Sequence, residues 1–257
     1  MATDKKVTRV SGKSTSDSSR PAFVPTAEAK GQASKFRMYA IILWILAFIA
    51  QIVGIWFLSK YAPLTTGQRI GLIAILAVDL VLLIFGSSFW KKANRFNPPS
   101  KASALFGIQS QMGVIMAVVC FLPVIIMAII KKEYIVTAIA ALFMVGGGLA
   151  SADFNPASQE EYAEQITEVE TLTGQDFVYW TKSGTKFHLY NDCRYINTSK
   201  TTEIFEGTVA DARHEKNITE LCSACKTKVM KEKGITDEQL QEAQDAAKNA
   251  LQNTELE

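Results

Sequence analysis

Apolar residues are concentrated in the central part of this chain, whereas both ends are polar. Nearly all the long apolar runs fall between residues 38 and 150 of 257. A helix that crosses a bilayer needs about 20 mostly apolar residues, and four segments reach or approach that length. They are residues 38–59, 70–90, 106–130 and 134–152. The pattern therefore predicts a membrane all-α fold over residues 38–152, a bundle of four transmembrane helices.

The first 37 residues carry no such pattern. They are rich in Ser, Thr, Lys and Ala without apolar periodicity, and a segment of this kind buries too little surface to offset the entropy lost on ordering. We expect residues 1–37 to be a disordered polar tail. No cleavable signal peptide is predicted, because the first apolar run begins near residue 38 and is long enough to stay in the membrane.

Basic residues near the predicted span ends indicate the orientation of the chain. If the N-terminus is cytoplasmic, eight Lys and Arg residues face the cytoplasm and four face the opposite side. Cytoplasmic ends carry the excess of Lys and Arg in membrane proteins. We therefore predict a multi-pass plasma-membrane protein whose N-terminus and C-terminal region are both cytoplasmic. The cytoplasmic set is Arg20, Lys30, Lys35, Arg37, Lys91, Lys92, Arg95 and Lys101, and the opposite set is Lys60, Arg69, Lys131 and Lys132.

Three segments follow the spans. Residues 153–176 are acidic and are predicted to be a spacer, helical from Ser158, which forms a capping box with Glu161. Residues 177–233 combine β-rich runs, turns and one short helical stretch, so we expect a small α+β module there. Residues 234–257 are predicted to form a polar, solvated C-terminal helix.

Four residues of the α+β module have the spacing of a metal site. His188 and Cys193 form H-x4-C at the end of a hairpin predicted over residues 178–188, and after 28 residues Cys222 and Cys225 form C-x2-C. Three thiolates and one imidazole are a complete tetrahedral set for structural Zn2+. A module this small buries little core, so a bound metal would add much of its stability.

Two alternatives to this ligand set stay open. The C-x2-C pair is also typical of redox proteins, although the βαβ context of thioredoxin-like motifs is not found here. His214 is a candidate substitute ligand, but its Lys- and Glu-rich surroundings favour an exposed helix. The fourth cysteine, Cys120, lies within the third predicted span and is interpreted as a small apolar residue.

The pattern of residues 177–228 also resembles that of a known family. It reads Y-W-T-x-S-G-x-x-F-H-x4-C, then G-T-V-x-x-A, then C-x-x-C. This resembles the metal-binding domain of the Ada-type DNA alkylation repair protein and small domains appended to some bacterial nucleases and membrane proteins. The resemblance implies that His188, Cys193, Cys222 and Cys225 are the zinc ligands. In the Ada-type domain four cysteines bind zinc and one accepts a methyl group, whereas here a His occupies one ligand position.

Asp79 is the outstanding polar residue of the predicted spans. It lies in the middle of the second span, where a carboxylate costs roughly 2.5 to 3.5 kcal/mol on insertion scales. We weigh two interpretations: a proton or cation site inside the bundle, with Gln51 or Thr137 as polar partner, and a protonated or hydrogen-bonded structural residue.

The sequence contains no recognisable catalytic constellation, so we do not expect an enzyme. The favoured interpretation is a membrane protein that displays a Cys3His structural zinc module for contact with a protein partner. One alternative is nucleic-acid binding at the membrane, implied by the Ada-type resemblance, although residues 177–233 carry a net charge of only +3 (ten Lys and Arg, seven Asp and Glu). The other alternative is a small-solute or ion transporter that uses Asp79.

Overall fold

The computed structural model describes residues 6–10 and 25–254, and these residues form two compact units. The helical unit comprises residues 25–99 and 103–156. The C-terminal unit comprises residues 157–254, together with residues 100–102 and the N-terminal residues 6–10. Each unit has its own apolar core.

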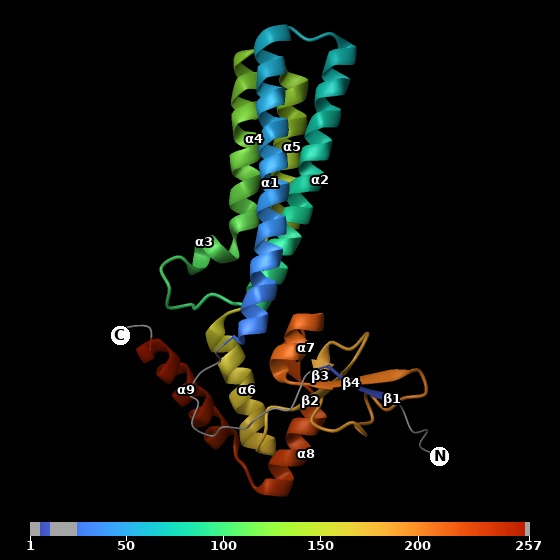
Figure 1. Ribbon diagram of the computed structural model, residues 1–257, viewed down its shortest axis with the longest axis vertical. Helices are drawn as coiled ribbons and strands as arrows, with labels where there is room; N and C mark the ends of the chain where they lie inside the picture. Colours follow the sequence, from blue (N-terminus) through green and yellow to red (C-terminus); the bar gives the residue numbers. More distant parts are fainter. Residues whose placement is uncertain (1–5, 11–24, 255–257) are drawn as a thin grey trace. The chain divides into compact units, whose positions relative to one another are not determined.

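Four helices of the helical unit are long and apolar enough to cross a membrane, which confirms the number of candidate spans predicted from the hydropathy pattern. They lie side by side in Figure 1, and buried side chains from all of them form one core. The four helices are α1 (Ala27–Tyr61), α2 (Thr66–Phe96), α4 (Met112–Ile130) and α5 (Tyr134–Ser151).

The helix bounds differ from the predicted ones because capping residues, rather than the apolar runs, set them. Helix α1 begins at Ala27, where the Thr26 side chain accepts a hydrogen bond from the Ala29 N–H. The third predicted span is divided into a short helix α3 (Phe106–Ser110) and α4, with Gln111 between them. Helix α4 continues through Pro123, whose missing N–H is tolerated inside it.

Aromatic and basic residues lie together at two levels of α1, one in its first half and one near its C-terminal end. The Arg37 guanidinium lies 5.7 Å from the centre of the Trp90 ring, and the Lys60 ammonium lies 5.1 Å from the Trp56 ring. Such residues are enriched at the two membrane–water interfaces. Arg37 and Lys60 are 23 residues apart in one helix, or about 35 Å, and a bilayer core is about 30 Å thick. The spacing of these residues therefore suits a bilayer.

Small residues allow the helices of this unit to approach closely. A Cβ on Gly86 of α2 would lie 2.6 Å from the Trp44 Nε1 of α1. A Cβ on Gly147 of α5 would lie 2.7 Å from the Leu80 Cδ1 of α2. A side chain at Gly86 would therefore collide with the Trp44 ring, and one at Gly147 would require Leu80 to shift, as expected where helix association depends on packing.

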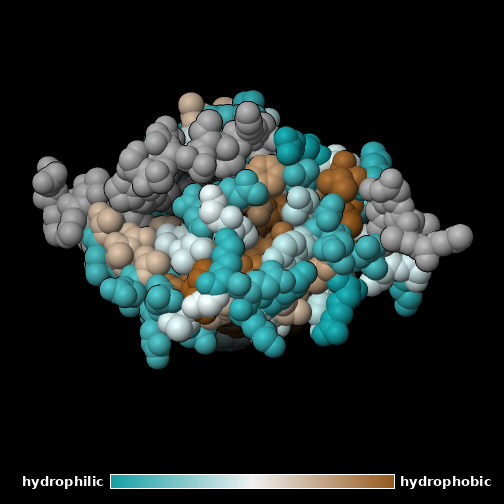
Figure 2. Space-filling view, turned by 90° about the horizontal axis from the view of Figure 1, so that it is seen from below, coloured by the Kyte–Doolittle hydropathy of each residue, from teal (hydrophilic) through white to brown (hydrophobic). Residues whose placement is uncertain are grey.

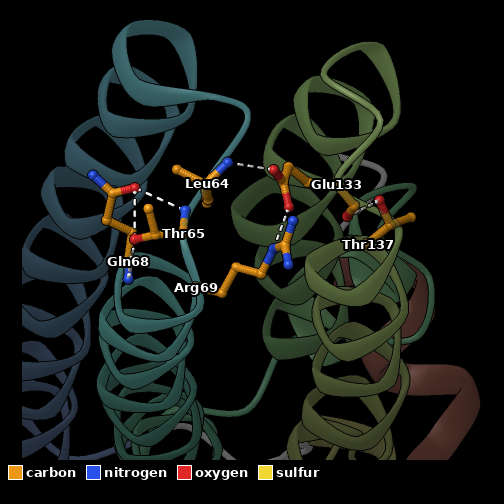
Figure 3. A network of polar contacts seen from close by, with 6 residues as sticks. All are labelled: Leu64, Thr65, Gln68, Arg69, Glu133 and Thr137. Carbon is orange, nitrogen blue, oxygen red and sulfur yellow. Dashed lines mark hydrogen bonds and ion pairs between the residues drawn. The ribbon is translucent and has the colours of Figure 1, made fainter.

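A buried carboxylate joins the two short connections of the helical unit. Glu133, which precedes α5, is 2% exposed; it accepts a hydrogen bond from the Leu64 N–H at 2.6 Å and pairs with Arg69 at 2.8 Å (Figure 3). The Arg69 hydrogen bond is the largest influence on this carboxyl and holds the pKa of Glu133 below its usual value. Thr65 and Gln68 cap α2 beside it (Figure 3). The α1–α2 and α4–α5 connections are thus fixed to each other.

The C-terminal unit contains two small sheets. The first has the strand order β1–β4–β2, in which β2 is antiparallel and β1 parallel to the central β4. The second consists of β3 and β5 in parallel. The strands are β1 (Lys6–Arg9), β2 (Val178–Thr181), β3 (Lys186–Phe187), β4 (Glu203–Gly207) and β5 (Glu220–Leu221).

Four helices complete this unit. Its core gathers buried side chains from α6, α7, α8, α9 and both sheets, including Val169, Leu172, Trp180 and Leu240. Seen from below in Figure 2, hydrophilic residues cover much of the visible surface. The helices are α6 (Gln159–Thr173), α7 (Val209–Lys216), α8 (Ser223–Lys233) and α9 (Asp237–Thr254).

Three segment predictions need correction. The expectation of a disordered tail is wrong for β1 and for the start of α1, whereas residues 1–5 and 11–24 lie outside the described residues. The acidic spacer contains α6, which is capped by Ser158 as predicted but contributes Leu172 to the core. The C-terminal helix is not a solvated appendage, because Leu240 of α9 is 2% exposed in the same core.

Candidate metal centre

The hairpin that begins with β2 positions His188. The Gly184 N–H donates to the Thr181 carbonyl at 3.1 Å and closes the turn. Tyr179 and His188 then exchange two backbone hydrogen bonds of 2.8 and 2.7 Å, which confirms the predicted hairpin. The two residues before His188 form β3, which pairs with β5. The backbone of His188 is therefore held between two sheets.

Cys193 lies in the loop that follows His188. Its carbonyl oxygen accepts hydrogen bonds from the N–H groups of Ile196 at 2.9 Å and Asn197 at 2.8 Å. These bonds form a turn at Cys193 and direct its half-buried thiol toward His188, whose Nδ1 is 3.3 Å from the Cys193 Sγ.

Cys222 and Cys225 lie at the start of α8. Cys222 is the N-cap residue of α8, and its N–H donates to the Phe187 carbonyl at 2.9 Å, one residue before His188. Cys225 lies in the first turn and accepts a hydrogen bond from the Leu189 backbone N–H. The N-terminal end of a helix carries partial positive charge, which favours thiolates. The fold thus connects both halves of the ligand pattern through the backbone.

The four candidate ligand atoms lie close enough together to share one metal ion. One donor atom each from His188, Cys193, Cys222 and Cys225 lies within 4.8 Å of the others, and the Cys225 Sγ is 3.8 Å from the His188 Nδ1. Bonds of about 2.3 Å to sulfur and about 2.0 Å to nitrogen place tetrahedral donors roughly 3.5 to 3.8 Å apart. The cluster is therefore the right size to hold a metal ion.

Burial shapes the protonation of this cluster. Burial lowers the pKa of His188 to about 4, so its imidazole is neutral near pH 7 and has a ring nitrogen available for coordination. Burial is also the main reason that the pKa of Cys225 is raised to about 12, and the neighbouring thiols of Cys193 and Cys222 add to it. A thiolate in this position needs a cation beside it, and a bound metal ion provides one.

The apolar core encloses the cluster. Cys222 and Cys225 are 4% and 2% exposed and belong to the core that contains Trp180 and Phe187. Only Cys193 is half-buried, as part of the shell packed against this core. Four donors enclosed in this way would fill all positions of a tetrahedral ion, as donors do in structural sites.

The other candidate residues lie elsewhere. The His214 ring in α7 packs against Tyr162 at 6.2 Å, and His214 is not among the four clustered residues. Cys120 is a fully buried free thiol in α4, as its apolar interpretation predicted. Asp79 is fully buried in α2, and of the two partners considered it contacts Gln51. Thr137 instead donates to the Glu133 carbonyl at 3.1 Å.

One important residue had no signal in the sequence. Arg213 of α7 is fully buried and donates to the Gln165 Oε1 at 2.7 Å and to the Glu161 Oε2 at 3.1 Å, both in α6. Its guanidinium also lies 4.3 Å from the centre of the Tyr162 ring. An Arg within a run of charged residues is usually solvated, so the sequence alone gave no reason to place it inside.

Comparisons with protein-family models, with curated proteins and with solved structures found no match to this chain. The resemblance to the Ada-type metal-binding domain therefore stays a prediction.

Proposed function

We propose that this chain is a membrane-anchored protein whose C-terminal unit is a zinc-stabilised module that binds a protein partner. The proposal rests on one observation above all: the fold brings His188, Cys193, Cys222 and Cys225 together within 4.8 Å. Three sulfurs and one imidazole nitrogen are a donor set typical of structural zinc, and they leave no coordination position for a substrate or water.

The surroundings of the cluster support a structural role for the metal. The ligands come from the β2–β3 hairpin, the following loop and the start of α8, so one ion would join all three. Tetrahedral zinc contributes about 10 to 16 kcal/mol to comparable small zinc-dependent folds. His188 and the three cysteines would hold the ion, and their role is to stabilise a binding surface rather than to perform a reaction.

The location that we propose is the cytoplasmic side of the plasma membrane. Four helices suited to crossing a membrane support the anchor. The excess of Lys and Arg near the predicted cytoplasmic ends supports the orientation. A reducing cytoplasm also keeps cysteines available for metal rather than for disulfides, and all four cysteines are free thiols here.

The basic residues of the C-terminal unit favour a protein partner over a nucleic acid. Several of them are neutralised by acidic neighbours: Lys226 pairs with Glu168 at 2.8 Å, and Lys186 pairs with Glu220 at 2.9 Å. Nucleic-acid modules instead present unpaired basic residues as a concentrated patch.

Metal content and partner capture of the purified full-length protein test this proposal together. We expect about one zinc per chain, and three thiols protected until a chelator is added. Cys222→Ser should lose the metal, the fold of the C-terminal unit and capture of the partner. Cys120→Ala, which removes a thiol outside the cluster, is the matched control and should retain all three.

Two results would contradict the proposal. If the Cys222→Ser variant still captures the partner, the metal-stabilised unit is not required for partner binding. Binding of nucleic acid that weakens steeply with salt, through release of counterions, would favour the nucleic-acid alternative instead.

A further inference from the structure

The contact between α1 and α2 contains a buried polar pair. Asp79 of α2 is 0% exposed and Gln51 of α1 is 3% exposed. The Gln51 Nε2 donates a hydrogen bond to the Asp79 Oδ2. Both residues lie well inside helices that are suited to crossing a membrane, so water is not at hand to satisfy their remaining polar atoms.

The ionised pair lacks one hydrogen-bond donor. Among the described residues, no donor reaches the Asp79 Oδ1 or the Gln51 Oε1. Both atoms are acceptors when the carboxyl is ionised, so they cannot satisfy each other. A carboxylic acid, in contrast, has one O–H donor. One added proton therefore supplies the donor that both oxygens lack.

We propose that Asp79 and Gln51 form an intramembrane proton-binding site. In this arrangement the Asp79 Oδ1–H donates to the Gln51 Oε1, while the Gln51 Nε2 donates to the Asp79 Oδ2. The two hydrogen bonds close a ring, and every buried polar atom of the ring has a partner. The proton links α1 to α2 as a part of the folded structure.

The charges around the pair favour the protonated state. Asp79 takes part in none of the ion pairs among the described residues, and the other buried carboxylate of the helical unit, Glu133, is paired with Arg69. Helix α4 adds the buried thiol of Cys120, which lies near enough to interact electrostatically with Asp79. The buried core of the helical unit is apolar, and α1, α4 and α5 contribute to it residues such as Ala47, Phe121 and Val136. An ionised Asp79 would thus be a buried charge with no cation to compensate it.

The same features argue against a transported ion. A carrier must release its proton or cation during each cycle, and release here would leave the uncompensated charge just described. These features therefore favour the second of the two interpretations of Asp79, in which it is a protonated structural residue that joins two helices.

Infrared spectroscopy of the full-length protein at about pH 7 tests the proton directly. A protonated carboxyl has a carbonyl stretch separate from those of ionised carboxylates. We expect a band that is lost in Asp79→Asn and shifted in Gln51→Leu, where the hydrogen-bond partner is removed. Asp176 needs a separate control, because burial raises its pKa to about 7, so that about half of this second carboxyl is protonated at that pH. The Asp176→Asn variant identifies that contribution.

Thermal unfolding of the helical unit gives a second, independent readout. Asn at position 79 supplies a permanent N–H donor to the Gln51 Oε1, so Asp79→Asn should match the native protein near neutral pH. At alkaline pH the native protein loses the proton and should unfold at a lower temperature, whereas Asp79→Asn should change less. A spectrum without the Asp79 band, or an identical pH dependence of both proteins, would overturn the proposal.

Discussion

Arg213 is a charged side chain with no exposed surface, and three contacts explain how it is accommodated. Glu161 compensates its charge, Gln165 accepts a second hydrogen bond, and the Tyr162 ring lies against the guanidinium. All three partners belong to α6, whereas Arg213 belongs to α7. A buried ion pair contributes little by itself, but removal of one member leaves a charge without compensation.

Replacement of Arg213 by Ala should therefore destabilise the C-terminal unit strongly. We expect a loss of about 3 kcal/mol in the free energy of unfolding, at the low end of the range for buried pairs because the Glu161 side chain is 22% exposed. Hydrogen exchange of α6 and α7 measures the loss locally. The control is Lys186→Ala, which breaks an exposed pair with Glu220 and should leave this exchange nearly unchanged. Equal effects of the two variants would contradict this account of Arg213.

At the scale of residues, the sequence predicted what spacing reveals. H-x4-C and C-x2-C identified four residues that the fold brings together. Asp79 was recognised by its depth in an apolar run, but the choice between Gln51 and Thr137 as its partner needed the structure. Helix packing decides that choice, and it depends on side-chain directions that a linear pattern does not contain.

At the scale of elements, α6 and α9 extend the C-terminal unit beyond the predicted module of residues 177–233. Both helices are rich in charged and polar residues, yet Val169 and Leu172 of α6 are fully buried and Leu240 of α9 is 2% exposed. Lys248 of α9 also pairs with Glu164 of α6 at 3.5 Å. The two helices pack together against the core that contains the His188, Cys193, Cys222 and Cys225 cluster.

A fragment limited to the predicted module should therefore fail to fold. Residues 177–233 contain all four candidate ligands but lack α6 and α9, so their core would lose Val169, Leu172 and Leu240. Loss of one large buried aliphatic side chain costs about 2 to 5 kcal/mol. We expect residues 157–257 to show cooperative thermal unfolding with zinc bound, and residues 177–233 to show none at the same zinc concentration. Cooperative unfolding of the shorter fragment would show that the two helices are dispensable.

The sequence predicted some elements better than others, and capping explains much of the difference. Helix α7 is the one short helical stretch predicted within residues 177–233; Thr208 and Asp211 form a capping box at its start, and Asn217 ends it in the left-handed region. Strand β1 was missed, since four residues are too short for a reliable alternation. Its position depends on partners far away in the chain, such as Glu203, which pairs with Lys6 at 3.2 Å.

At the scale of the whole molecule, the two units have separate cores, so removal of the metal should affect only one of them. We expect a chelator to increase hydrogen exchange throughout α6, α7 and α8 while α1, α2, α4 and α5 stay protected. Acid should act in the same direction, because protons compete with the metal for the thiolates and for His188, so metal occupancy falls as the pH falls. Unchanged exchange in the C-terminal unit after complete loss of metal would show that the ion does not stabilise its fold.

The pairing of β1 with β4 limits how many times this chain can cross a membrane between the two strands. β1 precedes all four candidate spans and β4 follows them, yet Val10 of the first segment donates a hydrogen bond to the Glu206 carbonyl of the second. Two strands pair only within one aqueous compartment, so an even number of crossings must separate them. Ser100, between α2 and α3, adds a second constraint through its hydrogen bond to Glu160 at 2.6 Å. An insertion error that omits one crossing would therefore place β1 and β4 in different compartments and break the sheet.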